Sequence, residues 1–212
     1  MVSSIYKKTF SVLMKRPFRL WGISLLAEFL CLVAYAGFIG VPAAAFCAAL
    51  LLSASMSMIF LNSYRTGLEP KTSYLFASFK KDRILRVLGG MAWMQLWIFL
   101  WSLIPIVGIV FGIIRMYEYR FVPYILMTRD DVKPTDAIKI SKQETMGYKG
   151  KMFGADILLG AVYLGVFLVF TLLGEIPYLG VLFRILWVLI AIAYGLLAPL
   201  FSGIMHAAFY VE

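Results

Sequence analysis

The stretch that decides the fold runs from residue 149 to residue 198 and reads KGKMFGADILLGAVYLGVFLVFTLLGEIPYLGVLFRILWVLIAIAYGLLA. It contains two apolar runs, Met152–Leu173 and Pro177–Ala198, and each has the length of about 20 residues that a helix needs to cross a bilayer. Lysines precede the first run, whereas the connection Gly174–Gly180 has neither Lys nor Arg. Because cations are retained on the cytoplasmic side, this stretch predicts a membrane hairpin that turns on the outer side.

The same pattern extends toward the N-terminus. Four further apolar runs lie near Phe18–Gly37, Pro42–Leu61, Ile84–Leu103 and Ile106–Met127. Backbone groups in lipid must be paired within their own segment, so every run is expected to be helical. The composition agrees, since 62% of the 212 residues are hydrophobic and the mean hydropathy is +0.89. The sequence therefore predicts an all-α polytopic membrane protein with six transmembrane helices in three hairpins.

The distribution of cations gives the expected orientation. Seventeen of the twenty Lys and Arg residues precede the first hairpin or lie in the two connections between hairpins. They are Lys7, Lys8, Lys15, Arg16, Arg19, Arg65, Lys71, Lys80, Lys81, Arg83, Arg86, Arg129, Lys133, Lys139, Lys142, Lys149 and Lys151. These segments and both termini are expected in the cytoplasm, where anionic lipid attracts cations. The same distribution accounts for the net charge of +9, so we expect no nucleic-acid partner.

The spacing of prolines suggests an internal repeat. We interpret the chain as a single integral-membrane domain, 1–212, with repeats at 4–66, 67–130 and 131–212. Pro42 and Pro105 mark equivalent outer turns, and Pro70 and Pro134 mark equivalent inner segments. Each repeat would be a cytoplasmic interfacial helix followed by a hairpin, and such parallel repeats pack around an axis along the membrane normal. The alternative is that any six-helix protein places its turns at a similar period.

The predicted interfacial helices are amphipathic to different degrees. The segments are Ile5–Arg16, Lys71–Arg83 and Pro134–Lys149. In the first, Ile5, Thr9 and Leu13 share one face, which is typical of a helix lying on a membrane surface. Its cations, expected to bind anionic lipid headgroups, are Lys7, Lys8, Lys15 and Arg16. The alternative for all three segments is a solvated cytoplasmic loop.

Charged residues at membrane depth are the strongest functional signal. They are Glu28, Arg115, Glu118, Arg120, Asp156 and Arg184. Matching depths along the helices predict pairs between Glu28 and Arg115 and between Asp156 and Arg120. Such charges are costly unless paired or hydrated, so they indicate either a structural ion-pair network or a polar cavity for a ligand. The neighbouring tyrosines are expected to line that cavity or to anchor at the interface: Tyr117, Tyr119 and Tyr124.

Catalysis has little support in the sequence. The only histidine, His206, is expected to be an interfacial residue, and we find no catalytic, phosphate-binding or metal-binding motif. Cys31 and Cys47 lie inside the first two apolar runs and are interpreted as small buried residues. We therefore expect a protein that is not an enzyme and has no cofactor or metal.

Several short motifs between Pro105 and Phe153 suggest a family. They are Tyr117, Tyr119, Pro123-Tyr124-Ile125-Leu126, Asp130, Ala137-Ile138, Ser141 and Met146-Gly147-Tyr148-Lys149, with Pro199 and Ala207-Ala208-Phe209-Tyr210 further on. In these the chain resembles a bacterial multi-pass membrane family of unknown function (domain of unknown function nine-seven-five), itself related to the membrane domain of some glycerophosphodiester phosphodiesterases. The chain departs from the family in reading Pro105-Ile-Val-Gly108 for a direct Pro-Gly, and in adding Arg115 and Arg120. The resemblance implies a lipid-facing role and carries over no activity.

We therefore expect a small transport component, or one that handles lipids or other amphiphiles, in the bacterial cytoplasmic membrane. Its polar intramembrane cavity would lie between the hairpins. One alternative is a membrane scaffold or an immunity factor that binds another membrane protein. Another is the permease subunit of an ATP-driven exporter. The expected partners are membrane lipids, anionic on the cytoplasmic side, and a membrane protein or a second copy of this chain.

Overall fold

The computed structural model describes residues 2–15, 17–37, 42–67, 70–105, 108–176 and 178–211. Every regular element in these ranges is helical, which confirms the all-α class. The elements are α1 (Val2–Lys15), α2 (Pro17–Gly37), α3 (Pro42–Thr66), η1 (Thr72–Phe79), α4 (Ile84–Ser102), α5 (Gly108–Glu118), α6 (Val122–Thr128), α7 (Asp136–Glu144), α8 (Lys149–Leu173) and α9 (Gly180–Val211). Arg16, Ile106, Val107 and Pro177, which entered the predictions, lie outside the described residues.

Five helices in the described part of the chain are long and apolar enough to cross a membrane: α2, α3, α4, α8 and α9. On α8 and α9 the apolar side chains are largely exposed, for example Val162, Leu168 and Val188. Lipid tails are as apolar as these side chains, so such exposure suits contact with lipid and not with water. The chain is therefore a multi-pass membrane protein.

The core of the molecule forms around α3, which contacts α2, η1, α4, α6 and α9. Two glycines allow helices to approach each other closely. A Cβ added at Gly203 of α9 would lie 2.4 Å from the ring of Phe60 on α3, and one at Gly90 of α4 would lie 2.5 Å from Leu126 of α6. A side chain at Gly203 would clash with the Phe60 ring, and one at Gly90 would displace the Leu126 side chain, so both glycines favour the close packing of the helices that enclose the cavity.

The single helix expected over Ile106–Met127 is wrong, because the chain forms α5 and α6 with a turn between them. Pro123 in the first turn of α6 has no N–H to continue the helix. The carbonyl of Glu118 instead accepts hydrogen bonds from Ser141 Oγ at 2.7 Å and from Thr145 Oγ1 at 3.3 Å. With 11 residues, α5 is about 16 Å long and is too short to cross the hydrocarbon alone.

Arg86, in the first turn of α4, holds the end of α6 beside the start of α4. Its guanidinium donates to the carbonyls of Leu126 at 2.7 Å, Arg129 at 2.9 Å and Val132 at 3.4 Å. It also pairs with Asp130 Oδ1 at 2.7 Å. The helix end thereby gains donors for carbonyls that have no partner within the helix. The end of α6 therefore lies beside the start of α4, so α5 and α6 together lead the chain back along α4.

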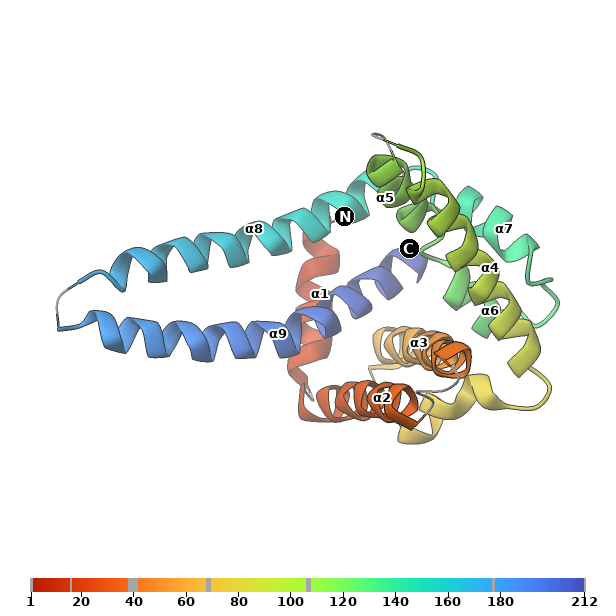
Figure 1. Ribbon diagram of the computed structural model, residues 1–212, viewed down its shortest axis with the longest axis horizontal. Helices are drawn as coiled ribbons and strands as arrows, with labels where there is room; N and C mark the ends of the chain where they lie inside the picture. The colour runs from red at the N-terminus through yellow and green to blue at the C-terminus, as the bar shows by residue number, and fades with distance from the viewer. Residues whose placement is uncertain are drawn as a thin grey trace.

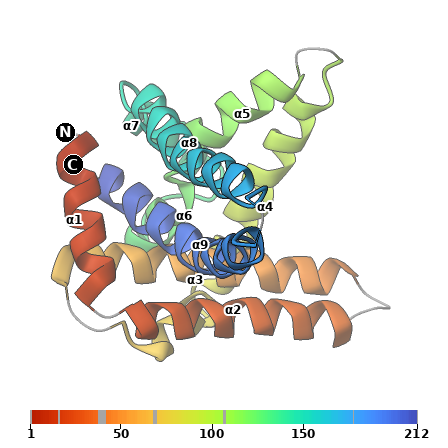
Figure 2. The ribbon, with the colours of Figure 1, turned by 90° about the vertical axis from the view of Figure 1, so that its left-hand side faces the viewer.

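The remaining hairpins are not arranged as equivalent units. In Figure 1 the α8–α9 hairpin projects from one side of the molecule and α2 and α3 are seen nearly end-on, whereas Figure 2 shows α2 and α3 lengthwise and α8 and α9 end-on. These two hairpins therefore lie across each other, and the symmetric packing expected of parallel repeats is not observed. Within the α8–α9 hairpin, the rings of Tyr163 on α8 and Tyr194 on α9 stack with their centroids 4.1 Å apart. Helix α9 also contains Pro199.

Short helices precede each apolar pair, as the repeat predicted. In α1 the shared face of Ile5, Thr9 and Leu13 is buried, and α1 contacts α9. The other two short helices also bury residues: η1 buries Leu75 and Ser78, and α7 buries residues of its apolar face. Part of each apolar face thus packs against protein, whereas Phe10 of α1 and Phe76 of η1 are exposed, so the location of these helices at the membrane surface stays a prediction. The order of elements repeats along the chain, but the repeats themselves stay a prediction.

Candidate functional site

The charges of α5 form an ion-pair cluster around Glu118, whose side chain is 7% exposed. Its carboxylate binds Arg115, one turn earlier on the same helix, and Lys149 Nζ at the start of α8, at 2.7 Å. The guanidinium of Arg115 also lies over the ring of Trp101, 4.3 Å from its centroid. The ion pairs with Lys149 and Arg115 compensate for the burial of the Glu118 carboxylate.

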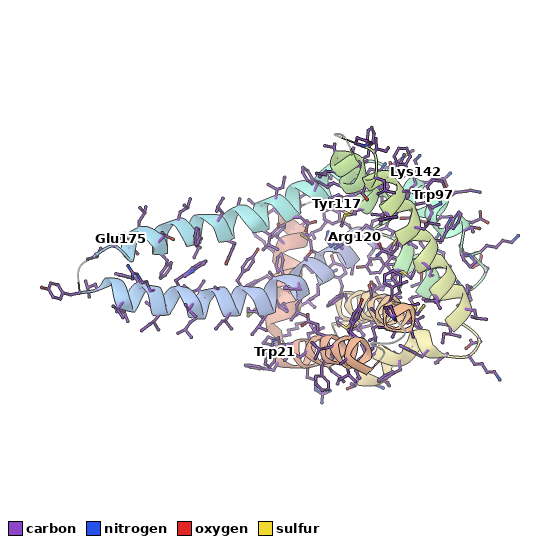
Figure 3. All side chains as sticks on the ribbon, in the orientation of Figure 1. Trp21, Trp97, Tyr117, Arg120, Lys142 and Glu175 are labelled. Carbon is purple, nitrogen blue, oxygen red and sulfur yellow. The ribbon has the colours of Figure 1, made fainter. Side chains whose placement is uncertain are left out.

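The expected pair between Glu28 and Arg115 is not formed. Glu28 is exposed on α2, and the carboxylate that binds Arg115 is Glu118. Arg184 also stays apart from the other membrane-depth charges, since its side chain is 67% exposed and lies 3.7 Å from Glu175. Figure 3 places Glu175 near the tip of the α8–α9 hairpin, far from Tyr117 and Arg120. Two of the six predicted residues therefore lie outside the buried clusters.

A second cluster joins α5, α8 and α9 through His206, which is 1% exposed. Asp156 Oδ2 accepts a hydrogen bond from the Tyr117 hydroxyl at 2.7 Å and lies 3.1 Å from His206 Nε2. The other ring nitrogen, Nδ1, lies 2.8 Å from Arg120 Nη2. The expected pair between Asp156 and Arg120 is therefore bridged by His206, which the sequence placed at the interface.

The partners of His206 determine its tautomer. A guanidinium is only a donor, so Nδ1 accepts from Arg120 and the ring proton is on Nε2, where it is donated to Asp156. Ser202 Oγ also lies 3.3 Å from Nδ1, so Ser202, His206 and Asp156 are in contact. They do not form an activated nucleophile, because the lone pair that would accept the serine proton already binds Arg120. The neutral ring therefore connects a carboxylate to a guanidinium without neutralising either.

Beside this cluster is a partly open cavity of about 530 Å³ between α3, α4, the α5–α6 segment and α9. Its lining combines four methionines with hydroxyl, amide and guanidinium groups. The lining residues are Ser53, Met56, Ser57, Phe60, Met91, Met94, Gln95, Ile98, Met116, Tyr119, Arg120, Pro123, Tyr124, Pro199, Ser202 and Gly203. Methionine side chains are flexible and polarisable, so they adapt to apolar groups of varied shape. The cavity can therefore hold a molecule with both apolar and polar parts.

The three predicted tyrosines divide between two surfaces. Tyr119 and Tyr124 line the cavity, as predicted for a ligand site. Tyr117 lines a separate apolar groove of about 380 Å³ between α5 and α8, which includes Ile113 and Phe153.

Of the cations predicted to bind lipid, Lys7, Lys8 and Lys15 are exposed on α1, and Arg16 lies outside the described residues. Lys8 Nζ lies 4.0 Å from the centroid of the Tyr64 ring. No group of three His, Cys, Asp or Glu side chains in the described ranges is placed to hold a metal ion. Lipid contact through the three lysines stays a prediction.

Sequence reasoning missed most of the cavity lining. On α3, Ser53, Met56, Ser57 and Phe60 follow the spacing of one helix face, but small and apolar residues on a membrane helix do not distinguish a cavity from helix packing. Comparisons with known proteins add no further residues, because no family model, curated protein or solved structure matches the chain. The family resemblance therefore stays a prediction.

Proposed function

We propose that this chain is a non-enzymatic protein of the bacterial cytoplasmic membrane that binds an amphiphile in the cavity between α3, α4, α6 and α9, as a small transport or lipid-handling component. The observation that carries the proposal is the mixed lining of that cavity. Met56, Met91, Met94 and Met116 offer apolar contact, and Gln95 and Arg120 offer polar groups. Its volume of about 530 Å³ falls within the range of about 300–1,000 Å³ that small-molecule sites occupy.

A cavity-filling substitution tests this proposal. In nanodiscs of neutral phosphatidylcholine, the protein would be offered oleate, oleoyl lysophosphatidic acid and monoolein, and the retained molecules would be counted by native mass spectrometry. Ser57→Trp should reduce retention of whichever of them binds by about tenfold, because an indole occupies the space beside Met56 and Phe60. Ser11→Trp, on the exposed face of α1, is the matched control. If none of the three is retained by the unmodified protein, the proposal is wrong.

The orientation in the membrane is part of the same proposal. The described structure has five long apolar helices, and an odd number of crossings would place the termini on opposite sides. Arg86 supports an even number, because it holds residues 126–132 beside the start of α4. The α5–α6 segment then completes the return that α5 is too short to make alone. Both termini and the segments around Lys80 and Lys142 would therefore share the cytoplasmic side, in accordance with the cation distribution.

Single cysteines at Lys80, Lys142 and Tyr178, each on a background without Cys31 and Cys47, test that orientation. A membrane-impermeant maleimide added to intact cells should label position 178 alone, since it is fully exposed at the tip of the α8–α9 hairpin. Positions 80 and 142 should react only after the cells are opened. Labelling of position 80 or 142 in intact cells would overturn the proposed orientation.

A membrane scaffold is the second candidate function, and the α8–α9 hairpin favours it. Its apolar side chains are exposed along the whole projecting arm, including Leu172, Leu182 and Ile192. Lipid or a helix of another membrane protein can cover such a surface. Native mass spectrometry of the same nanodiscs distinguishes the candidates: a stoichiometric protein partner with no retained amphiphile would favour the scaffold.

A further inference from the structure

Arg120 differs from the other buried cations in its partners. Arg115 and Lys149 both bind the carboxylate of Glu118. Arg86 pairs with Asp130. Arg120 is half-buried, and its recorded contact is with the neutral ring of His206; among the described residues no carboxylate forms an ion pair with it. A guanidinium has five N–H donors, so a single contact leaves most of its donors unused.

The nearby carboxylate is already committed elsewhere. Asp156 receives hydrogen bonds from the Tyr117 hydroxyl at 2.7 Å and from His206 Nε2 at 3.1 Å, and Ser202 Oγ lies 3.4 Å from its other oxygen. His206 stands between Asp156 and Arg120, so the two charges are linked without contact. This arrangement fixes one edge of the guanidinium and orients it, while Arg120 remains part of the cavity lining.

Resting on the proposed function, we propose that Arg120 is the receptor for the head group, and that the amphiphile bound in the cavity is anionic, with a carboxylate or a phosphate. Both of these anions match the planar fork of a guanidinium, which binds them through paired N–H donors. The Tyr124 hydroxyl and Gln95 line the same cavity and offer further hydrogen bonds to the head group. Met91, Met94 and Met116 would contact the acyl chain.

The amphiphiles named above, which share one acyl chain, test the head-group charge in the same nanodiscs. Oleate and oleoyl lysophosphatidic acid should be retained at least about tenfold more tightly than monoolein, a ratio that corresponds to one charge-assisted contact. Arg120→Gln should abolish this preference, so that the three amphiphiles are retained to a similar extent. Arg120→Lys, which keeps the charge without the fork, should retain part of it and covers the case in which the glutamine variant does not fold. Arg184→Gln, at the exposed tip of the α8–α9 hairpin, is the matched control and should retain the full preference.

The outcomes separate the two proposals. Equal retention of all three amphiphiles would overturn the anion receptor and leave the amphiphile site intact, whereas retention of none would overturn both. A preference that survives Arg120→Gln but disappears when Lys7, Lys8 and Lys15 are neutralised would assign the anion to the membrane surface and overturn the inference.

Discussion

Glu118→Gln is expected to lower the free energy of unfolding by about 3–5 kcal/mol, the loss typical of removing one partner from a buried ion pair. The carboxylate is 7% exposed and serves two cations, so its neutralisation leaves Arg115 and Lys149 without an anion. Denaturation in mixed micelles, followed by circular dichroism, measures the loss.

The chain provides a matched control for this prediction. Glu28→Gln makes the same chemical change at an exposed position and should alter stability by less than about 0.5 kcal/mol. The double variant Glu118→Gln with Arg115→Gln should recover part of the loss, since it removes the unpaired guanidinium as well. A stable Glu118→Gln protein would show that water reaches the cluster and that Glu118 does not hold α5 to α8.

Arg86→Met is expected to lower the free energy of unfolding by about 3 kcal/mol. The guanidinium donates to three backbone carbonyls and one carboxylate at the end of α6, and methionine preserves the apolar stem without any donor. Each buried carbonyl left without a partner carries a penalty of about 1–3 kcal/mol, reduced where water can enter. The side chain of Arg86 is 16% exposed, so water can replace only some of the hydrogen bonds that these carbonyls would lose. The same denaturation measurement applies.

Arg83→Met provides the comparison within the same helix turn. Arg83 binds Asp130 Oδ2 at 2.6 Å, but this carboxylate is 59% exposed, and within the described residues the Arg83 guanidinium donates to no backbone carbonyl. An exposed pair of this kind contributes about 0–1 kcal/mol. Equal destabilisation by Arg83→Met and Arg86→Met would show that Arg86 acts through its ion pair with Asp130 and not through the carbonyls at the end of α6.

Hydropathy predicted most of the apolar helices because their length and composition are local properties. The expected run Phe18–Gly37 became α2 (Pro17–Gly37), and Ile84–Leu103 became α4 (Ile84–Ser102). The run ending at Ala198 was too short, since α9 continues to Val211 through Pro199. In a sequence, a proline usually predicts the end of a helix. Here the helix continues beyond Pro199, and α9 packs against α3 and α1.

Prediction of the break between α5 and α6 requires residues that are distant in the sequence. Pro123 was a local signal that could have placed it, because proline in the first turn of a helix marks a start. The donors that replace the lost helical bonds, Ser141 and Thr145, come from α7 and its C-terminal end more than twenty residues away. No periodicity in the run Ile106–Met127 reveals them.

Depth matching located the charges but not their partners. It gives a coordinate along the membrane normal and nothing about rotation around the helix axis, so Glu28 and Arg115 were paired although Glu28 is exposed on α2. His206 was missed for a different reason. Hydropathy predicts that the apolar run ends at Ala198 and leaves the histidine in a tail, whereas α9 continues and brings His206 to Asp156.

Pro199 gives α9 a mechanical weak point. The ring removes the N–H that would bind the carbonyl of Gly195, so a helix bends there more easily than elsewhere. Helices that cross one bilayer tilt from its normal by no more than about 40°, while α8–α9 and α2–α3 lie across each other (Figures 1 and 2). If the projecting arm changes its direction when both hairpins enter one bilayer, Pro199 is the position at which α9 bends most easily. Because Pro199, Ser202 and Gly203 line the cavity, a bend of α9 at Pro199 would also change the shape of the cavity wall.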